Sequence, residues 1–339
     1  MSDENLQIRL AKRPTGAPDP SCFQVERGPK PEPGEGEVLV RHRFLSLDPY
    51  MRGRMSDAES YAEPVAIGDV MIGGTVGVVE ESRHPKLAKG DFVMSMGGWQ
   101  TWSVAKGGEV RKLQLPEAHL SLALGALGMP GLTAWWGLKH IGQPTKGETL
   151  VVAAATGPVG AMVGQLAQRA GARAVGVAGG PEKCAFATET LGFDACLDHR
   201  ADDFAEQLAA ACPDGVDVYF ENVGLPVLGP VMPLLNAHAR IPLCGLVAHY
   251  NATSLPAGPD RTPVLLGLIL RKKIRLEGFI IADHFDEFGA FAADVAPAVL
   301  DGSITVREDV VEGLENAPEA FIGMLTGSNF GKLVVKVAD

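Results

Sequence analysis

The chain has 339 residues and a net charge of −11, with 46% hydrophobic and 21% charged residues. This length exceeds that at which a single hydrophobic core usually stops growing, so two domains are expected. The negative charge argues against nucleic-acid binding and against anionic membrane surfaces, and the composition excludes a disordered or fibrous chain.

The five cysteines are odd in number and never spaced as C-x-x-C, which argues against a disulfide framework and against a zinc knuckle. The first residues lack an apolar signal segment, and no stretch reaches the roughly 18 apolar residues that would span a bilayer. We therefore expect a cytoplasmic protein with reduced thiols.

The beginning of the chain is rich in β-type patterns. Apolar runs typical of strands, separated by turns rich in glycine and proline, occupy residues 6–11, 37–47, 68–80 and 91–104. Glycines within the later runs suit bulges or barrel corners. These patterns predict a small, partly open β-barrel.

This character changes at residues 120–138, where small and apolar residues recur at helical spacing. They predict a long buried helix with a break near Met129-Pro130-Gly131, because proline interrupts a helix. We expect the two domains to meet in this segment.

Residues 148–168 form the most informative stretch, since they read as a buried strand, a tight turn and an amphipathic helix. The turn ATGPVG at 155–160 matches A-x-G-x-x-G, the dinucleotide-binding fingerprint with its first glycine replaced. Gly157 would let the main chain approach a pyrophosphate, and Gly160 would let the helix pack against the strand. The helix N-terminus would offer N–H groups to the anion. A plain turn of an α/β domain is the alternative.

Strand and helix patterns alternate farther along the chain. Strands are expected at 149–155, 172–178, 195–197, 216–220, 240–245 and 274–281, and helices at 181–191, 201–212 and 226–235. Such alternation predicts a doubly wound parallel sheet with right-handed crossovers. Residues 332–337 return to a strand pattern, which indicates that the C-terminus rejoins the first domain. The expected domains are residues 1–125 with 300–339, and residues 126–299.

An NADP-type dinucleotide is the cofactor that this second domain favours. NAD-selecting domains place a carboxylate at the end of the second strand, where it binds the ribose 2′-OH. That place reads Ala178-Gly179-Gly180 here, and Lys183 follows in the next helix. Small residues leave room for a 2′-phosphate, and an ammonium neutralises it. On chemistry alone, a solvated lysine is an equal alternative for Lys183.

Hydrogen-bond donors are the candidate catalytic groups. The sequence contains no nucleophile elbow, and its histidines do not cluster with Cys or Glu at metal-ligand spacing, so no metal site is predicted. Without a metal, a dehydrogenase must activate a carbonyl through phenols or amides. Tyr50 follows a strand, and Tyr250 and Asn222 follow strands of the parallel sheet at the edge that binds ligands. Ordinary packing in a loop or at a rim is the alternative for both tyrosines. Tyr219 points inward along its strand and is expected in the core.

Several large apolar side chains could shape a pocket for a bulky substrate: Trp99, Trp102, Trp135, Trp136 and Met129. Packing is the favoured interpretation of aromatic residues near a domain junction.

Seven blocks, in order along nearly the whole chain, carry a resemblance: LSLDPYMRGRM, LGALGMPGLTAWWGL, VVAAATGPVGAMVGQLA, GVAGGPEK, FENVG, CGLVAHYN and FIGMLTGSNFGKLVV. With them the chain resembles the zinc-independent medium-chain dehydrogenase/reductases, in the leukotriene and prostaglandin reductase branch, and within that branch the bacterial curcumin reductases. The resemblance implies a GroES-like barrel completed by C-terminal residues, an inserted Rossmann domain, and an active-site cleft at their junction. It also implies NADPH-dependent reduction of the C=C bond of α,β-unsaturated ketones or aldehydes, such as curcumin-like or 15-oxoprostaglandin-like enones.

The resemblance also implies roles for individual residues. Tyr50 and Tyr250 match the phenols of the substrate site, and Tyr250 is the leading donor to the carbonyl oxygen. The expected substrate contacts are Tyr50, Tyr61, Met129 and Tyr250, and the expected cofactor contacts are Thr156, Gly157, Pro158, Val159, Gly160, Gly179, Lys183, His199, Asn222, Cys244, Gly245, Tyr250 and Asn329. Relatives commonly read Asn-Tyr-Lys where this chain has Asp198-His199-Arg200, so a contact of His199 and Arg200 with the 2′-phosphate stays open.

By the same resemblance we expect a homodimer that acts on a small hydrophobic enone, without nucleic-acid or membrane partners. Two alternatives remain. A quinone or carbonyl reductase on the same scaffold would leave the alkene intact, and a non-catalytic NADPH-binding sensor or structural protein would bind the cofactor without turnover.

Overall fold

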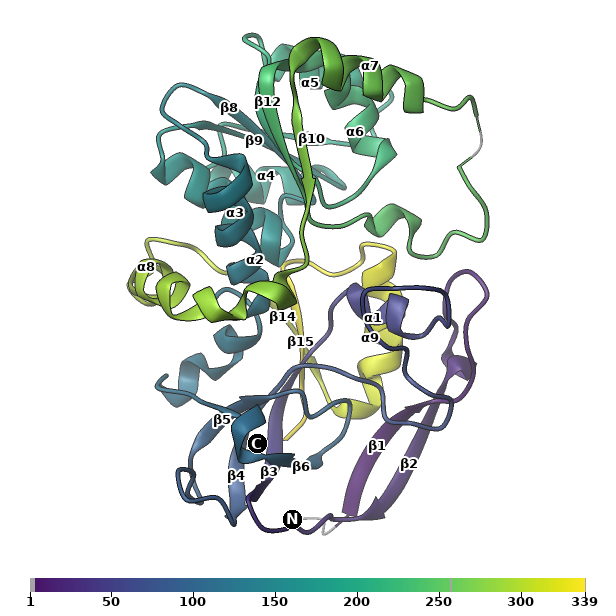
Figure 1. The fold of residues 1–339 in the computed structure, drawn as a ribbon, viewed down its shortest axis with the longest axis vertical. Coiled ribbons are helices and arrows are strands. Elements are labelled where there is room, and N and C mark those ends of the chain that lie inside the picture. The colour runs from purple at the N-terminus through teal and green to yellow at the C-terminus, as the bar shows by residue number, and fades with distance from the viewer. Residues whose placement is uncertain (1–3, 257, 339) are drawn as a thin grey trace. The chain divides into compact units, whose positions relative to one another are not determined.

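A computed structural model describes residues 4–256 and 258–338 and divides the chain into two compact units (Figure 1). The first unit comprises Met1–Gly125 and Glu308–Asp339, and the second comprises Ala126–Arg307. The chain therefore leaves the first unit once and returns to it near its C-terminal end.

The first unit is built mainly of strands. Its larger sheet has seven strands in the order β14-β15-β3-β4-β5-β7, with β6 paired to β3. The strands are β3 (Glu37–Ser46), β4 (Thr75–Ser82), β5 (Phe92–Ser95), β6 (Trp102–Lys106), β7 (Arg111–Lys112), β14 (Glu308–Glu312) and β15 (Lys332–Lys336). β15 pairs antiparallel with β3 and parallel with β14, so C-terminal residues extend this sheet. β1 (Glu4–Leu10) and β2 (Phe23–Pro29) form a separate antiparallel pair.

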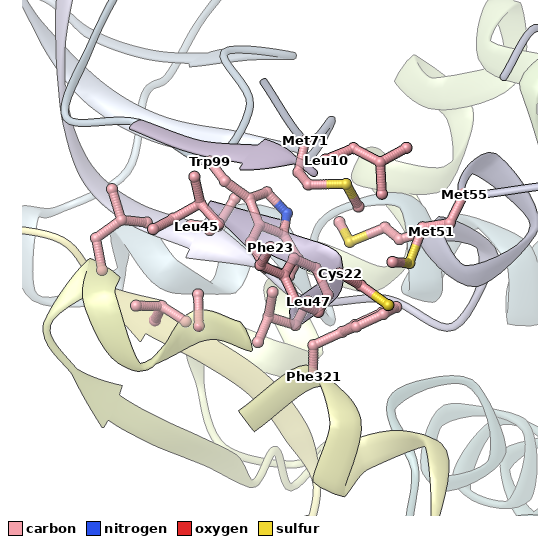
Figure 2. Close-up of a cluster of buried hydrophobic side chains, with 14 of the residues drawn as sticks. Leu10, Cys22, Phe23, Leu45, Leu47, Met51, Met55, Met71, Trp99 and Phe321 are labelled. Carbon is pink, nitrogen blue, oxygen red and sulfur yellow. The ribbon is translucent and has the colours of Figure 1, made fainter. Parts of the chain in front are cut away.

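One hydrophobic cluster joins β1 and β2 to several of the helical elements of this unit, namely η1, α1, η8 and α9 (Figure 2). The helical elements are η1 (Pro20–Cys22), α1 (Tyr50–Arg54), η2 (Gly107–Glu109), η3 (Glu117–Leu124), η8 (Leu314–Asn316) and α9 (Ala317–Leu325). Trp99 stacks on Phe23 with ring centroids 5.6 Å apart, and it meets the edge of Phe321 of α9 at 5.5 Å. Trp99 is completely buried, so packing is its role.

The second unit contains a parallel six-stranded sheet in the order β10-β9-β8-β11-β12-β13. The strands are β8 (Thr149–Ala153), β9 (Arg173–Ala178), β10 (Ala195–Asp198), β11 (Val216–Phe220), β12 (Leu235–Leu243) and β13 (Arg275–Gly278). The helical elements are α2 (Met129–Gly137), η4 (Leu138–Gly142), α3 (Pro158–Arg169), α4 (Pro181–Glu189), α5 (Phe204–Ala211), α6 (Leu225–Val231), η5 (Met232–Leu234), η6 (Val247–His249), α7 (Thr262–Lys272), η7 (Ile281–Glu287) and α8 (Phe288–Leu300).

The strand order reverses between β8 and β11, because the chain runs outward from β8 through β9 to β10 and then crosses to β11 on the other side of β8. Open parallel sheets bind ligands at such a switch point, beyond the carboxyl ends of the strands. The predicted α/β fold with a doubly wound parallel sheet is confirmed.

The prediction of a long helix over residues 120–138 is wrong for its first half. Residues 117–124 form 3-10 turns, and the α-helix begins only at Met129. Gly125 and Gly128 separate the two pieces with non-helical backbone angles, which glycine adopts without steric penalty.

The second unit ends at Arg307, beyond the expected boundary at residue 299. Residues after α8 stay with this unit because the N–H of Thr305 donates to Oε1 of Gln165 (2.7 Å), and Nε2 of Gln165 donates back to the carbonyl of Thr305 (3.0 Å). Gln165 lies in α3, so the reciprocal bonds tie the returning segment to that helix.

Among the described residues, no helix is both long and apolar enough to cross a bilayer.

Candidate cofactor-binding and active site

The turn between β8 and α3 packs the helix tightly against the end of the strand. A Cβ on Gly160 would lie 2.2 Å from the carbonyl oxygen of Ala154, so this position has no room for a side chain. Ala154 has a left-handed φ of 54°, a strained conformation for alanine of the kind found in functional turns. Within α3, which is described in full, the first turn has neither a side-chain cap nor an acidic residue. Its N–H groups and the helix dipole therefore suit an anion.

Asp198, at the end of β10, is turned toward backbone groups. Its Oδ1 accepts hydrogen bonds from the N–H of Gly180 (2.9 Å) and the N–H of Arg200 (3.0 Å). The bond from Gly180 is the largest cause that lowers the pKa of this carboxyl. Asp198 thus shapes the two loops, and Gly180 supplies the positive φ of 98° that its own loop needs.

Basic side chains gather around Gly179. A Cβ on Gly179 would lie 3.1 Å from Nε2 of His199 and 3.2 Å from Cζ of Arg200. Burial, followed by the charge of Arg200 and more weakly that of Lys183, lowers the pKa of His199. His199 is therefore neutral at neutral pH and can form a hydrogen bond beside two cations. This arrangement suits a phosphate dianion. The segment Asp198-His199-Arg200 differs from the Asn-Tyr-Lys expected from relatives, but it keeps basic side chains at this place.

The loop after β11 spans the switch point of the sheet. Nδ2 of Asn222 donates a hydrogen bond of 2.8 Å to the carbonyl of Ala153, the last residue of β8. The carbonyl of Glu221 accepts hydrogen bonds from the N–H of Cys244 (3.0 Å) and Gly245 (3.2 Å), just beyond β12. The carboxyl ends of three neighbouring strands are thereby joined.

Tyr250 folds back onto the hydrogen-bonded loops that follow β11 and β12. A Cβ on Gly245 would lie 3.2 Å from the Tyr250 hydroxyl and 3.6 Å from the carbonyl oxygen of Asn222. The intervening η6 is held by hydrogen bonds from Val247 N–H to the Asn222 carbonyl (3.2 Å) and from Ala248 N–H to the Val223 carbonyl (3.1 Å). The structure therefore brings together Tyr250, Gly245 and Asn222, which the sequence predicted separately.

Glu221 organises this loop, although no role was predicted for its side chain. The residue is 1% exposed, and its Oε1 accepts hydrogen bonds from the N–H of Val223 (2.6 Å) and Gly224 (2.9 Å). Burial raises the pKa of Glu221. Tyr219 is also fully buried, which confirms its predicted core position, and burial raises its pKa. A glutamate directly after an apolar strand is the signal that could have identified Glu221.

Tyr50 belongs to the first unit and begins α1. Burial, then the charges of Asp48 and Tyr61, raise the pKa of its phenol well above the usual range. Asp48 is itself buried, and its Oδ1 lies 2.8 Å from Nζ of Lys332, the first residue of β15. Nζ also donates to the carbonyl of Leu47 (2.8 Å). The buried ion pair thus fixes the segment that leads into Tyr50.

The remaining predicted residues occupy varied places. Tyr61 is exposed on the first unit. Asn329, also of the first unit, donates from Nδ2 to the carbonyl of Gly331 (2.9 Å) and shapes the turn before β15. Met129 begins α2 in the second unit, and Thr156 is buried in the turn between β8 and α3.

The tryptophans of α2 pack inside the second unit. Trp136 stacks between His140 and His284, with ring centroids 4.7 Å and 3.8 Å away, and its Nε1 donates to Glu287 (2.9 Å). Trp135 donates from Nε1 to Asp294 (2.7 Å). Both are buried, so the packing interpretation is confirmed for them.

Within the described ranges, no group of three or more His, Cys, Asp or Glu side chains is placed to hold a metal ion.

Both units of the chain are similar to known protein families. Residues 6–113 match a family described as the N-terminal domain of oxidoreductase, and residues 158–296 match one described as zinc-binding dehydrogenase.

Individual proteins match from end to end. The NADPH-dependent curcumin reductase of Escherichia coli is 58% identical over 335 residues, which are 98% of this chain and 97% of that protein. The NADP(+)-dependent 2-alkenal reductase of Nicotiana tabacum is 37% identical over 340 residues, which are 98% of both chains. The crystal structure of CurA from Vibrio vulnificus in complex with NADPH has a TM-score of 0.95 and 56% identity, covering 98% of this chain and 99% of that one.

Proposed function

The chain belongs to the zinc-independent medium-chain dehydrogenase/reductases, in the leukotriene and prostaglandin reductase branch, and on this premise we propose that it reduces the C=C bond of α,β-unsaturated ketones and aldehydes with NADPH. The first unit is the GroES-like domain of this family, and the second is its Rossmann domain. The activity requires a hydride donor, a group that accepts negative charge at the carbonyl oxygen, and a proton for the α-carbon.

The residues of the second unit fit NADPH. The uncapped start of α3, with Gly157, would receive the pyrophosphate. His199 and Arg200, packed over Gly179, together with Lys183, would hold the 2′-phosphate. Asn222, Cys244, Gly245 and Tyr250 would line the nicotinamide half. When bound, NADPH supplies the hydride.

One observation carries the chemistry: the Tyr250 hydroxyl is held at the end of β12, against Gly245 and beside the switch point of the sheet. Hydride transfer to the β-carbon of an enone leaves negative charge on the carbonyl oxygen. A positioned phenol that donates to this oxygen lowers the barrier, because the donor is already oriented when the charge develops. We assign this role to Tyr250.

The enolate must then gain a proton at its α-carbon. Water and the phenol of Tyr50 are the candidate donors. Because burial and Asp48 raise the pKa of Tyr50, the phenol carries its proton throughout the neutral range and can donate it or a hydrogen bond.

The activity is tested by following the loss of NADPH absorbance with a diaryl enone of the curcumin type, with a small 2-alkenal, and with the saturated ketone. Turnover with both enones, but none with the saturated ketone, is expected, and the product should be the saturated carbonyl compound. An allylic alcohol would identify a carbonyl reductase, reduction of quinones alone would identify a quinone reductase, and tight NADPH binding without any turnover would identify a sensor.

The preference for NADPH over NADH is expected to depend on Arg200. Arg200→Glu should raise the KM for NADPH about 10- to 100-fold, because a charged hydrogen bond to the phosphate is lost and a like charge replaces it. The KM for NADH, which has no 2′-phosphate, should change little. Arg169→Glu, at the far end of α3, makes the same charge change and should leave both constants unaltered. Equal effects on the two cofactors would refute the assignment of Arg200.

We propose that the chain forms a homodimer through the β13 edge of the parallel sheet. β13 is the outer strand of that sheet, and an unpaired edge can hydrogen-bond to a second copy. The neighbouring α7 exposes Val264, Leu266 and Leu270, the last at 80%. Such an apolar face on a helix suits a symmetric interface.

Leu266→Glu with Leu270→Glu should therefore shift the mass measured by light scattering from dimer to monomer. Leu255→Glu, which places the same charge on a leucine that is 91% exposed in a loop outside α7, should leave the dimer intact. A monomeric unaltered protein would contradict the proposal.

We also propose a cytoplasmic location, because all five cysteines are free thiols, which persist in reducing compartments.

A further inference from the structure

The side chain of Glu221 holds two consecutive peptide groups of the loop after β11. Its Oε1 accepts hydrogen bonds from the N–H of Val223 (2.6 Å) and the N–H of Gly224 (2.9 Å). These N–H groups share their peptide groups with the carbonyls of Asn222 and Val223, and both peptide bonds are trans. Because a trans peptide group is planar and directs its N–H and C=O to opposite sides, Glu221 also sets the direction of these two carbonyls.

The same two carbonyls carry η6. The carbonyl of Asn222 accepts a hydrogen bond from the N–H of Val247 (3.2 Å), and the carbonyl of Val223 accepts one from the N–H of Ala248 (3.1 Å). Glu221 and η6 therefore bond to opposite sides of the same two peptide groups. An acceptor on the N–H side polarises a peptide group and strengthens its carbonyl as an acceptor in turn, so the Glu221 side chain supports both bonds to η6.

A packing contact adds a second link between this loop and Tyr250. Gly224 has a φ of 111°, and a Cβ at this glycine would lie 2.7 Å from Nε2 of His249. The ring of His249 therefore lies directly against the main chain of Gly224, whose N–H is bonded to Glu221. Since His249 is the residue before Tyr250, a rotation of this peptide group displaces the segment that carries the phenol.

We propose that Glu221 is a positioning residue for the phenol of Tyr250, which it holds in place through two peptide groups and η6. The consequence for catalysis rests on the proposed function, because it takes Tyr250 to be the donor to the carbonyl oxygen of the enone. A displacement of about 1 Å at a reacting group costs on the order of 10²-fold in rate. The loss of the Glu221 side-chain bonds should therefore be visible in kcat.

Two substitutions separate these hydrogen bonds from the space that the side chain fills. Glu221→Gln keeps an oxygen that can accept both N–H groups, whereas Glu221→Leu fills a similar volume without an acceptor. Both leave the main-chain carbonyl of Glu221, which accepts the N–H of Cys244 and of Gly245. With Glu221→Leu, kcat for a diaryl enone should fall about 10- to 100-fold, while the KM of the enone should change by less than about threefold. Glu221→Gln should retain kcat within about threefold.

The place of the phenol can also be measured without turnover. The chain has four tyrosines, so labelling with 3-fluorotyrosine gives four fluorine NMR resonances, which single Tyr→Phe variants assign. In Glu221→Leu the resonance of Tyr250 should shift or broaden, whereas that of the exposed Tyr61 should stay unchanged. In Glu221→Gln the resonance of Tyr250 should stay close to its original position. An unaltered Tyr250 resonance in Glu221→Leu, or an equal loss of kcat in both Glu221 variants, would overturn the proposal.

Asp217→Leu is the matched control. Asp217 lies on the same strand and accepts the N–H of Thr149 through Oδ2 (2.9 Å), but it lies at the amino end of that strand. The variant should leave kcat and the Tyr250 resonance unchanged, and a response equal to that of Glu221→Leu would refute a specific role of Glu221. If the Tyr250 resonance responds as expected while the unaltered protein reduces no enone, the proposed function fails and the placement of Tyr250 by Glu221 stands.

Discussion

Replacing Tyr250 with phenylalanine is expected to lower kcat for enone reduction by about 10²- to 10³-fold, which corresponds to about 2.7–4 kcal/mol of lost stabilisation in the transition state. The change removes only a hydroxyl group, which lies against Gly245 at the end of β12. Because the charge on the carbonyl oxygen develops during hydride transfer, the effect should appear in kcat more than in the KM of the enone. Steady-state kinetics with a diaryl enone measure both constants.

Tyr219→Phe is the matched control for this result. It removes the same group from the same unit, but Tyr219 is a fully buried core residue on β11. Its kcat should stay within roughly threefold of the unaltered protein, since no transition-state contact is lost. If Tyr250→Phe also retains kcat, the phenol is not the donor at the carbonyl oxygen, and Tyr50→Phe becomes the next variant to measure.

The sequence was most informative where structure depends on neighbouring residues. The strands of the second unit are short runs of buried apolar residues bounded by glycine or polar turns, and this local signal located all six of them. The turn at 155–160 was recognisable for the same reason, because the steric need for Gly160 arises from Ala154, which lies close by in the chain.

Features that join distant segments could not be predicted in this way. Lys332 pairs with Asp48 across the two segments of the first unit, and nothing in KLVVKV distinguishes this lysine from the less buried Lys336. The boundary at Arg307 depends on contacts between Gln165 and Thr305. The helices α7, α8 and α9 were not predicted. α8 and α9 are strongly apolar, so that few polar positions mark one face of either helix.

The same distinction between local signals and tertiary contacts applies to the candidate site. Asn222, Gly245 and Tyr250 were identified because they follow strands of a parallel sheet, where ligands bind. That the Tyr250 hydroxyl returns to Gly245 follows from η6 and its bonds to the loop after β11, a tertiary arrangement without a sequence signature. Glu221 was missed because its function is to hold N–H groups within the protein.

Lys332→Met is expected to destabilise the first unit by about 3–5 kcal/mol, because it leaves the carboxylate of Asp48 buried without its counterion. Methionine fills most of the space of the lysine stem, which packs against Gly125, so little of the loss should come from a cavity. Nζ also donates to the carbonyl of Leu47, and that acceptor loses its partner as well. Denaturant unfolding of the variant and the unaltered protein, followed by tryptophan fluorescence, measures the difference.

Lys336→Met separates the ion pair from the loss of a lysine. Lys336 ends the same strand and pairs at 3.8 Å with the exposed Glu312, and such surface pairs contribute about 0–1 kcal/mol. The double variant Lys332→Met with Asp48→Asn removes both charges and should recover part of the stability lost in Lys332→Met. If Lys332→Met costs no more than Lys336→Met, the buried pair does not stabilise the segment before Tyr50. If the double variant is as unstable as Lys332→Met alone, the loss comes from the packing of the lysine stem, and the orphaned carboxylate is not its cause.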